Sequence, residues 1–440
     1  MTAAPGLPRT RVDACPGALQ THPAADGGLA RVRVPGGMLT ASQLRVLAAA
    51  ARDLGDGHLE MTSRGNLQLR GLAAGVGPEL GDRLAGAGLL PSATHERVRN
   101  VLASTLSGRD GSGHLDARPW VPALDAGLCA DPGLADLPGR YLATLDDGRG
   151  DVAGLGGDVG LLALDAGTVA LLLAGTDSGL RTDPAGAVVL ALAATRAFAA
   201  ERTAQGGTAW RLAELTDGPA RVAARLAGTR AGHPTGSAPG TLGVDPRDLV
   251  AVPAAPLVGP VGAVAQLDGR TALIGVVPLG RLTAGQAELL AGLAAQVQLT
   301  PWRSVVVPDL AEDAVDDAAV DLYRTGVVFD AASPWLQVTT CAGSPGCARS
   351  LADVRGDALA AVAAGTLPAG GARQHWAGCA RRCGSPHGEV VDVLAVAPSA
   401  DAPAGYVVTA PSPPAPDPPA PDQPAPDQPA PDQHRVDEDL

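Results

Sequence analysis

The chain has 440 residues, 46% of them apolar, so it is long enough for two or more domains with complete hydrophobic cores. Its formal net charge of −13 argues against nucleic acid as a partner, because phosphate contacts need a basic face. All 33 basic residues are arginines, and the lack of lysine excludes a Walker-type phosphate loop, a Schiff-base lysine and a lysine proton donor.

The first residues, 1–13, contain no apolar core of the kind that a secretory signal needs, so the sequence predicts a cytoplasmic protein. The longest uncharged stretch, 249–267, is interrupted by prolines, and no membrane span is expected. In a reducing cytoplasm the six cysteines are more often metal ligands or buried residues than disulfides. Two of them, Cys15 and Cys129, are interpreted as packed or free thiols rather than ligands.

Two ten-residue windows resemble each other, one beginning at Val34 and the other at Val277, 243 residues later. In each copy an alternating strand, 29–34 or 273–277, leads through a Pro/Gly turn to a threonine that can cap a helix. The helices that follow are expected over 41–54 and 284–297. Chance similarity is the alternative, but strand, turn and helix recur in the same order, which predicts a duplicated α+β unit.

The repeat also suggests how the chain divides into domains. The expected segments are a first unit at 12–75, its larger mixed domain at 76–230, a second unit at 241–310 and its larger domain at 311–408. A glycine-rich run, 228–240, is interpreted as the linker between the halves. The proline-rich repeats of 411–440 predict an extended, solvated tail, either dispensable or a docking segment for a partner.

Four cysteines form a compact pattern, with Cys341 and Cys347 separated by five residues and Cys379 and Cys383 by three. The first pair follows an expected strand, 335–340, and encloses a Gly/Pro turn flexible enough to fold around a large inorganic group. We expect these four thiolates to hold a four-iron four-sulfur cluster. A structural zinc site, which normally uses narrower spacing, and inert buried cysteines are the alternatives.

A helix expected over 348–364 can return the second cysteine pair to the first. Arg381 and Arg382 lie between the second pair, where they can offset the negative charge of a cysteine-bound cluster. His375 and His387 flank this pair and are interpreted either as ligands of a separate iron or partners of a cofactor, or as ordinary loop histidines.

Cysteines with this spacing near the end of a duplicated chain resemble those of the sulfite and nitrite reductase family. The segments 61–70 and 97–101 support the resemblance, and 15–19 and 25–37 are similar to the precorrin-3B synthase branch of that family. The resemblance covers about residues 12–400. It implies an α+β fold of duplicated ferredoxin-like half-domains, each followed by a larger mixed α/β cofactor domain.

The resemblance also implies roles for individual residues. Cys383 matches the cysteine that bridges the cluster to a sirohaem iron, so either sirohaem or a separate non-haem iron is expected beside the cluster. Arg64 and Arg99 match family positions that contact the tetrapyrrole or the ligand on its iron, and Arg140 is a weaker match of the same kind. For each of these arginines, an ordinary strand-end or surface position is the alternative.

In the precorrin-3B synthase branch, precorrin-3A is converted to precorrin-3B with dioxygen and with electrons that originate from NADH, here through a separate donor protein. Reducing sulfite or nitrite consumes many protons, and the reductases place lysines beside arginines to deliver them. The corresponding stretch here, 137–143, has an arginine and a leucine, and arginine holds its proton too tightly to donate it readily.

Two other functions remain as alternatives, namely a sirohaem-dependent sulfite or nitrite reductase and a non-catalytic iron–sulfur electron carrier. Asn66 and Gln68 alternate with leucines on an expected strand, so they face either the site or solvent, and solvent is favoured.

Overall fold

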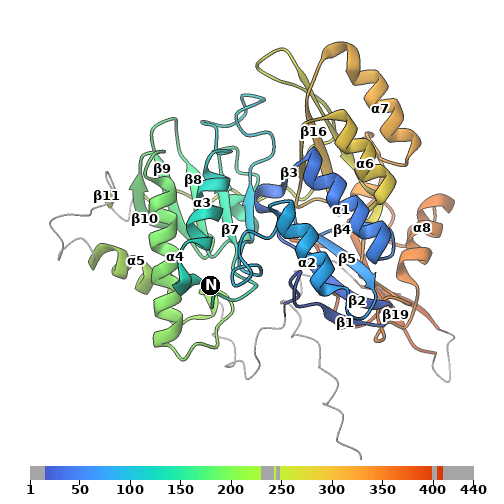
Figure 1. Ribbon diagram of the computed structural model, residues 1–440, viewed down its shortest axis with the longest axis horizontal. Helices are drawn as coiled ribbons and strands as arrows, with labels where there is room; N and C mark the ends of the chain where they lie inside the picture. Colours follow the sequence, from blue (N-terminus) through green and yellow to red (C-terminus); the bar gives the residue numbers. More distant parts are fainter. Residues whose placement is uncertain (1–14, 229–241, 244–247, 399–403, 410–440) are drawn as a thin grey trace, which may run out of the picture.

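The computed structural model describes residues 15–228, 242–243, 248–398 and 404–409 (Figure 1). The expected tail at 411–440 and almost all of the expected linker at 228–240 lie outside these residues. Across the described part of the chain, no helix combines the length and the apolar character that are needed to cross a lipid bilayer.

Two five-stranded antiparallel sheets form the centre of the molecule. The first contains, in spatial order, β1 (His22–Ala24), β2 (Gly27–Val32), β5 (Leu67–Leu72), β4 (His58–Met61) and β14 (Arg281–Thr283). The second contains β12 (Gly262–Ala265), β13 (Thr271–Val276), β16 (Ser304–Leu310), β15 (Gln296–Leu299) and β3 (Met38–Thr40). Each sheet therefore takes its last strand from the other copy of the repeat.

The two copies share one hydrophobic core. The exchanged strands β3 and β14 lead directly into α1 (Ala41–Leu54) and α6 (Ala284–Leu293), which pack against each other (Figure 1). Arg45 of α1 donates to the Ala291 carbonyl at 2.6 Å, and buried leucines and alanines of both copies form a single cluster. Two further helices, α2 (Gly77–Gly86) and α7 (Val315–Arg324), flank this pair.

The two turns before these helices have the same geometry, which confirms the duplication. Thr40 accepts a hydrogen bond from the Gln43 backbone, and Thr283 accepts one from Gln286, so both expected caps are complete capping boxes. The preceding residues Gly36 and Leu279 have φ angles of 63° and 55°. The second helix ends at Leu293 rather than at 297, because residues 296–299 form β15.

Two outer sheets follow the two central units. The third sheet contains β11 (Leu242–Gly243), β10 (Thr176–Thr182), β9 (Val169–Leu173), β8 (Val159–Ala163), β7 (Ala143–Asp146) and β6 (Val101–Ala103). Its helices are α3 (Trp120–Cys129), α4 (Ala187–Ala204) and α5 (Gly218–Gly228). The fourth sheet contains β17 (Val338–Thr340), β18 (Gln374–Ala377), β19 (Val391–Val396) and β20 (Gly405–Val408), with helix α8 (Val354–Ala364).

The outer sheets have the same topology at their cores. In each, three parallel strands (β6–β7–β8 and β17–β18–β19) are followed by an antiparallel one, β9 or β20. In Figure 1 the third sheet lies on the left of the central sheets, whereas α8 and β19 lie at the lower right. The expected α+β fold, in which each copy is a small unit followed by a larger mixed domain, is therefore confirmed.

Two expected elements near the cysteines are shorter than the sequence suggested. The strand expected over 335–340 begins at Val338, because residues 334–336 form a tight helical turn. The helix expected from 348 begins at Val354, where the Asp353 side chain accepts from the Gly356 backbone as an N-cap. Leu351 consequently lies in the preceding loop and is 54% exposed.

The capping boxes allow a direct test of the duplicated unit. Replacing Thr283 with Ala removes the acceptor for the Gln286 backbone and is expected to lower the free energy of unfolding by about 1 kcal/mol. In the same turn, a Cβ on Gly285 would meet no atom closer than 3.9 Å, so Gly285→Ala is expected to raise it by about 0.5 kcal/mol. Urea unfolding followed by circular dichroism measures both changes, and an unchanged midpoint for Thr283→Ala would contradict the assignment.

Candidate functional site

A cavity of about 380 Å³ lies between the first central sheet and the loops of the fourth sheet. Seven of the residues that line it are arginines, namely Arg31, Arg64, Arg70, Arg140, Arg303, Arg355 and Arg382. Glu60 is the one acidic residue among the described lining residues. We call this cavity the arginine pocket, because its wall is strongly cationic within a chain whose net charge is −13.

Some of this positive charge is balanced inside the protein. Arg70 forms a forked ion pair with Asp26, with both N–O distances at 2.9 Å. Arg355 contacts Glu60 at 2.7 Å. Arg382 contacts Asp392 at 2.7 Å as well. The lining still carries more guanidinium than carboxylate, and such a surface favours a ligand with several negative groups.

The four cysteines converge at one edge of the fourth sheet. Cys341 directly follows β17, and Cys379 and Cys383 follow β18, its parallel neighbour. The Cys341 backbone donates to the Trp376 carbonyl at 3.0 Å, and the Gly378 backbone donates to the Cys341 sulfur at 3.3 Å. Cys341 and Cys383 also line the arginine pocket, so the cysteine loops form part of its wall.

Burial, together with the charges of Cys341, Cys379 and Cys347, raises the pKa of Cys383 to about 11. The pKa of Cys341 is raised by burial and by the charges of Cys379 and Cys347, so the four sulfurs lie close enough for their charges to interact. Thiolates gathered in this way need a strong positive counter-charge, which the irons of a cluster supply. Together with the backbone donor on Cys341, this donor set fits a four-iron four-sulfur cluster.

Within the described part of the chain, no three His, Cys, Asp or Glu side chains are grouped to hold a single metal ion.

Two of the three arginines expected in the site lie in the arginine pocket. Arg64 lines it and donates through Nη1 to the Arg140 carbonyl at 3.3 Å. Arg140 lines it as well, and its guanidinium carbon lies 5.0 Å from the centre of the Trp210 ring. These two arginines form one cationic wall on the side of the first copy.

The position expected for Arg99 has to be corrected. Its guanidinium is buried and forms a forked ion pair with Asp125 of α3, at 2.6 and 2.7 Å, and it also donates to the Leu89 carbonyl. It is not among the lining residues of the arginine pocket. The carboxylate on α3 holds this side chain away from the cavity, so Arg99 connects two segments of the first copy.

Asn66 does not face solvent, because it is 1% exposed, and it lines the arginine pocket, which was the alternative expectation. Its side chain accepts from the Val34 backbone and donates to Asn100, both at 2.9 Å, and thereby connects the first sheet to the residues before β6. Gln68 is half-buried and lines the arginine pocket, so it does not simply face water.

His375 and His387 are expected either to serve a separate iron or a cofactor, or to be ordinary loop residues. His375 lies in β18, is fully buried, and shares a 2.9 Å hydrogen bond between Nδ1 and the Thr339 hydroxyl. Burial lowers its pKa to about 3, so the imidazole is neutral at ordinary pH. His387 lies in a loop and lines a neighbouring cavity. Cys15, interpreted as a packed or free thiol, lines the arginine pocket.

The first copy has its own version of the cysteine site, built from different residues. In β6 and β7, Val101 lies opposite Ala143, just as Val338 lies opposite Gln374 in β17 and β18. The Ser104 backbone donates to the strand partner Leu145 at 3.0 Å, as the Cys341 backbone does to Trp376. Ser104 is therefore the counterpart of Cys341.

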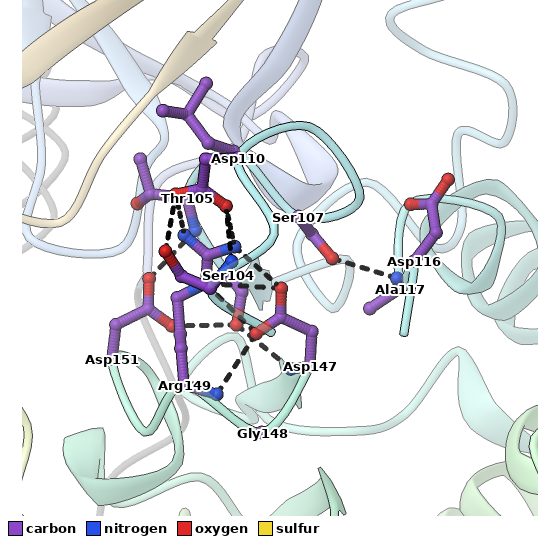
Figure 2. Close-up of polar contacts among 12 residues, drawn as sticks. Ser104, Thr105, Ser107, Asp110, Asp116, Ala117, Asp147, Gly148, Arg149 and Asp151 are labelled. Atoms are coloured by element: carbon purple, nitrogen blue, oxygen red, sulfur yellow. Dashed lines mark hydrogen bonds and ion pairs between the residues drawn. The ribbon is translucent and has the colours of Figure 1, made fainter. Parts of the chain in front are cut away.

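Figure 2 shows what surrounds Ser104 in place of cysteines. Its hydroxyl donates to Asp151 at 2.7 Å, the Thr105 backbone donates to the same carboxylate at 2.8 Å, and Arg149 pairs with Asp147 and Asp110. Burial, with the nearby charge of Asp146, raises the pKa of Asp151 to about 6. Hydrogen-bonded side chains thus fill this site in the first copy, and the cysteine set belongs to the second.

A second cavity of about 260 Å³ adjoins the arginine pocket, and Ser63 and Arg303 line both. Its wall is largely apolar and includes the segment 254–259 and Val261. Thr339 and Arg373 line this second cavity. The equivalent residues of the first copy are Leu102 and Leu142, which pack into a small apolar cluster instead.

Sequence reasoning missed most of the pocket arginines, especially Arg31, Arg70, Arg303 and Arg355. Arg31 and Arg70 lie on neighbouring strands of the first sheet. That both side chains reach the same cavity depends on how these strands pair, which the sequence alone does not show. For Arg303 a signal did exist, because it occupies the position of Gly65 when the repeated turns are compared.

Comparisons with known proteins agree with this architecture. A family model for the nitrite/sulfite reductase ferredoxin-like half domain matches residues 22–87 and 264–322, one match in each copy. A precorrin-3B synthase from a Sinorhizobium species is 30% identical over 400 residues, which cover 90% of this chain and 82% of that protein. A ferredoxin–nitrite reductase from Synechococcus elongatus is 34% identical over 127 residues, which cover 28% of this chain and 25% of that protein.

Among solved structures, the NirA protein of Mycobacterium tuberculosis has the same fold, with a TM-score of 0.68 and 19% identity. The match covers 87% of this chain and 74% of that one. With two matching half domains, the shared fold and a relative aligned over most of both chains, this protein belongs to the precorrin-3B synthase family, within the nitrite and sulfite reductases.

Proposed function

We propose that this chain is a precorrin-3B synthase, an oxygen-dependent monooxygenase that converts precorrin-3A to precorrin-3B in aerobic cobalamin synthesis. The observation that carries the proposal is the arginine pocket itself, because Cys341 and Cys383 line the same cavity as seven arginines. A polycarboxylate bound there would lie directly beside a redox centre. The similarity to the Sinorhizobium precorrin-3B synthase supports this assignment over most of the chain.

The arginines account for recognition of the substrate. Precorrins carry acetate and propionate groups around the ring, and arginine can bind each carboxylate through two parallel hydrogen bonds. Arg64 and Arg140 would hold carboxylates on the side of the first copy, while Arg355 and Arg382 would do so on the side of the cysteine loops. Because these cations repel one another in a partly buried space, an anionic ligand would relieve that repulsion.

In this proposal Cys341, Cys347, Cys379 and Cys383 hold a four-iron four-sulfur cluster, which when bound would pass electrons one at a time. The Gly378 N–H stabilises negative charge on the Cys341 sulfur. Sirohaem attached through Cys383, or a separate non-haem iron, would complete the oxygen chemistry, and a separate protein would deliver the electrons that originate from NADH.

The same residues explain why this proposal is preferred to sulfite or nitrite reduction. In the stretch 137–143, Arg140 reaches the pocket and Leu142 is buried, so neither supplies a readily transferable proton. The wall is suited to binding anions and to holding a large substrate still. A hydroxylation that inserts oxygen from dioxygen makes a smaller demand on protein proton donors than full reduction of a bound anion.

Removing one cysteine tests the metal site. Cys341→Ser is expected to abolish most of the iron and acid-labile sulfide in anaerobically purified protein, because one of four ligands is lost. Cys129→Ser is the matched control, since that cysteine ends α3 in the first copy and does not line the arginine pocket, and it should keep the wild-type content. Zinc in the wild-type protein, or unchanged sulfide in Cys341→Ser, would refute the cluster assignment.

Turnover tests the proposed reaction. With a reduced donor and air, the wild-type protein is expected to convert precorrin-3A to precorrin-3B, as followed by mass spectrometry. Arg64→Gln should lower kcat/KM at least about tenfold, because it removes a forked carboxylate contact. Arg270→Gln, at an arginine that is half-exposed outside the pocket, should leave the rate unchanged.

Two results would overturn the reaction assignment. Turnover of sulfite or nitrite with no change in precorrin-3A would favour the reductase alternative. A cluster that is present and reducible, with precorrin-3A unchanged under air, would instead favour an electron carrier.

A further inference from the structure

Arg303 lies in a turn whose equivalent in the first copy has a glycine, Gly65, at the same position. In the first copy, the Gly65 backbone donates to the Thr62 carbonyl at 3.1 Å, and Thr62 donates to the Asn66 carbonyl at 2.9 Å. In the second copy, Arg303 donates to Thr300 at 3.1 Å, and Thr300 donates to Ser304 at 3.0 Å. The turns are equivalent, so Arg303 occupies the Gly65 position.

This position requires left-handed backbone, with φ of 64° at Gly65 and 59° at Arg303. Glycine adopts it without penalty, whereas a residue with a Cβ does so at a cost in free energy. Backbone strain of this kind persists where the surrounding structure imposes it, and it is frequent at functional sites. The first copy shows that the turn itself does not need an arginine.

The side chain of Arg303 lies where three features of the site meet. It lines both the arginine pocket and the adjoining cavity. Its Nη2 donates to the Gly384 carbonyl at 3.1 Å, and Gly384 directly follows Cys383. Of the five N–H donors of a guanidinium, this contact uses one.

The charges around Arg303 are mostly of the same sign. Burial lowers its pKa to about 10, with Glu60 opposing this effect and with Arg355 and Arg373 adding to it. The group is still a cation near neutral pH. A partly buried cation beside two others is stabilised by an anion, and a carboxylate of a ligand in the arginine pocket would supply one.

We propose that Arg303 is a positioning residue that couples occupancy of the arginine pocket to the loop of Cys383. One part of its guanidinium holds the Gly384 carbonyl, and the rest binds a carboxylate of the tetrapyrrole. Ligand binding therefore fixes the cluster loop and changes the electrostatic environment of the cluster. This inference rests on the proposed function, and it assigns a role to a residue outside the family motifs.

The test uses full-length, anaerobically purified holoprotein and uroporphyrin III, a tetrapyrrole with eight carboxylates, as the probe. Three quantities are measured, namely the Kd from the change in the porphyrin absorption band, the midpoint potential of the cluster with and without the probe, and the melting temperature. The variants are Arg303→Gly, Arg303→Lys and Arg64→Lys, the last as a matched change elsewhere in the pocket.

In wild-type protein, the probe is expected to shift the cluster potential. Arg303→Gly relieves the left-handed backbone, so it should melt no lower than wild type, yet bind about tenfold more weakly and lose the potential shift. Arg303→Lys keeps the positive charge but not the forked guanidinium, so it should bind the probe with intermediate affinity and also lose the shift in cluster potential. Arg64→Lys should weaken binding but keep the shift.

Three results would overturn the inference. If Arg303→Gly melts well below wild type while its Kd and potential shift are unchanged, the arginine is a structural residue only. If the wild-type protein does not bind the probe, this inference fails, whereas the proposed function fails only if precorrin-3A is also left unchanged. Wild-type binding with equal shifts in both Arg303 variants refutes the coupling alone.

Discussion

The exchange of β3 and β14 between the two central sheets is the constraint on which the rest of this structure depends. Because each small sheet ends in a strand from the other copy, the two units share one core and cannot be separated as independent domains. The exchange fixes the first sheet against the fourth, and the arginine pocket lies between them. Residues far apart in the chain, such as Arg64 and Cys383, therefore line one cavity.

Duplication has produced two related sites with different chemistry. At the ends of equivalent parallel strands, the first copy has a serine joined to a hydrogen-bonded carboxylate network, and the second has cysteines. The neighbouring interior differs in the same way, since Leu102 and Leu142 pack together where Thr339 and Arg373 border a cavity. Packed and hydrogen-bonded side chains therefore fill this region in the first copy, whereas cavities border it in the second.

Local signals in the sequence were sufficient for the duplication and for the helix caps, because each is carried by short segments of the chain. The strand exchange could not be predicted, since β3 pairs with residues more than 250 positions away and leaves no local pattern. The sequence alone was equally unable to show which arginines line the pocket. Arg64 and Arg99 looked alike, but Asp125 on α3 holds Arg99 away from the pocket, and only the fold brings that carboxylate near.

A crystal structure of anaerobically prepared protein with bound precorrin-3A would show most directly whether a polycarboxylate tetrapyrrole lies against the proposed cluster cysteines. We expect a four-iron four-sulfur cluster on Cys341, Cys347, Cys379 and Cys383, with ligand carboxylates on Arg64, Arg140 and Arg355. A single zinc ion on the cysteines, or a tetrapyrrole bound away from these arginines, would contradict it.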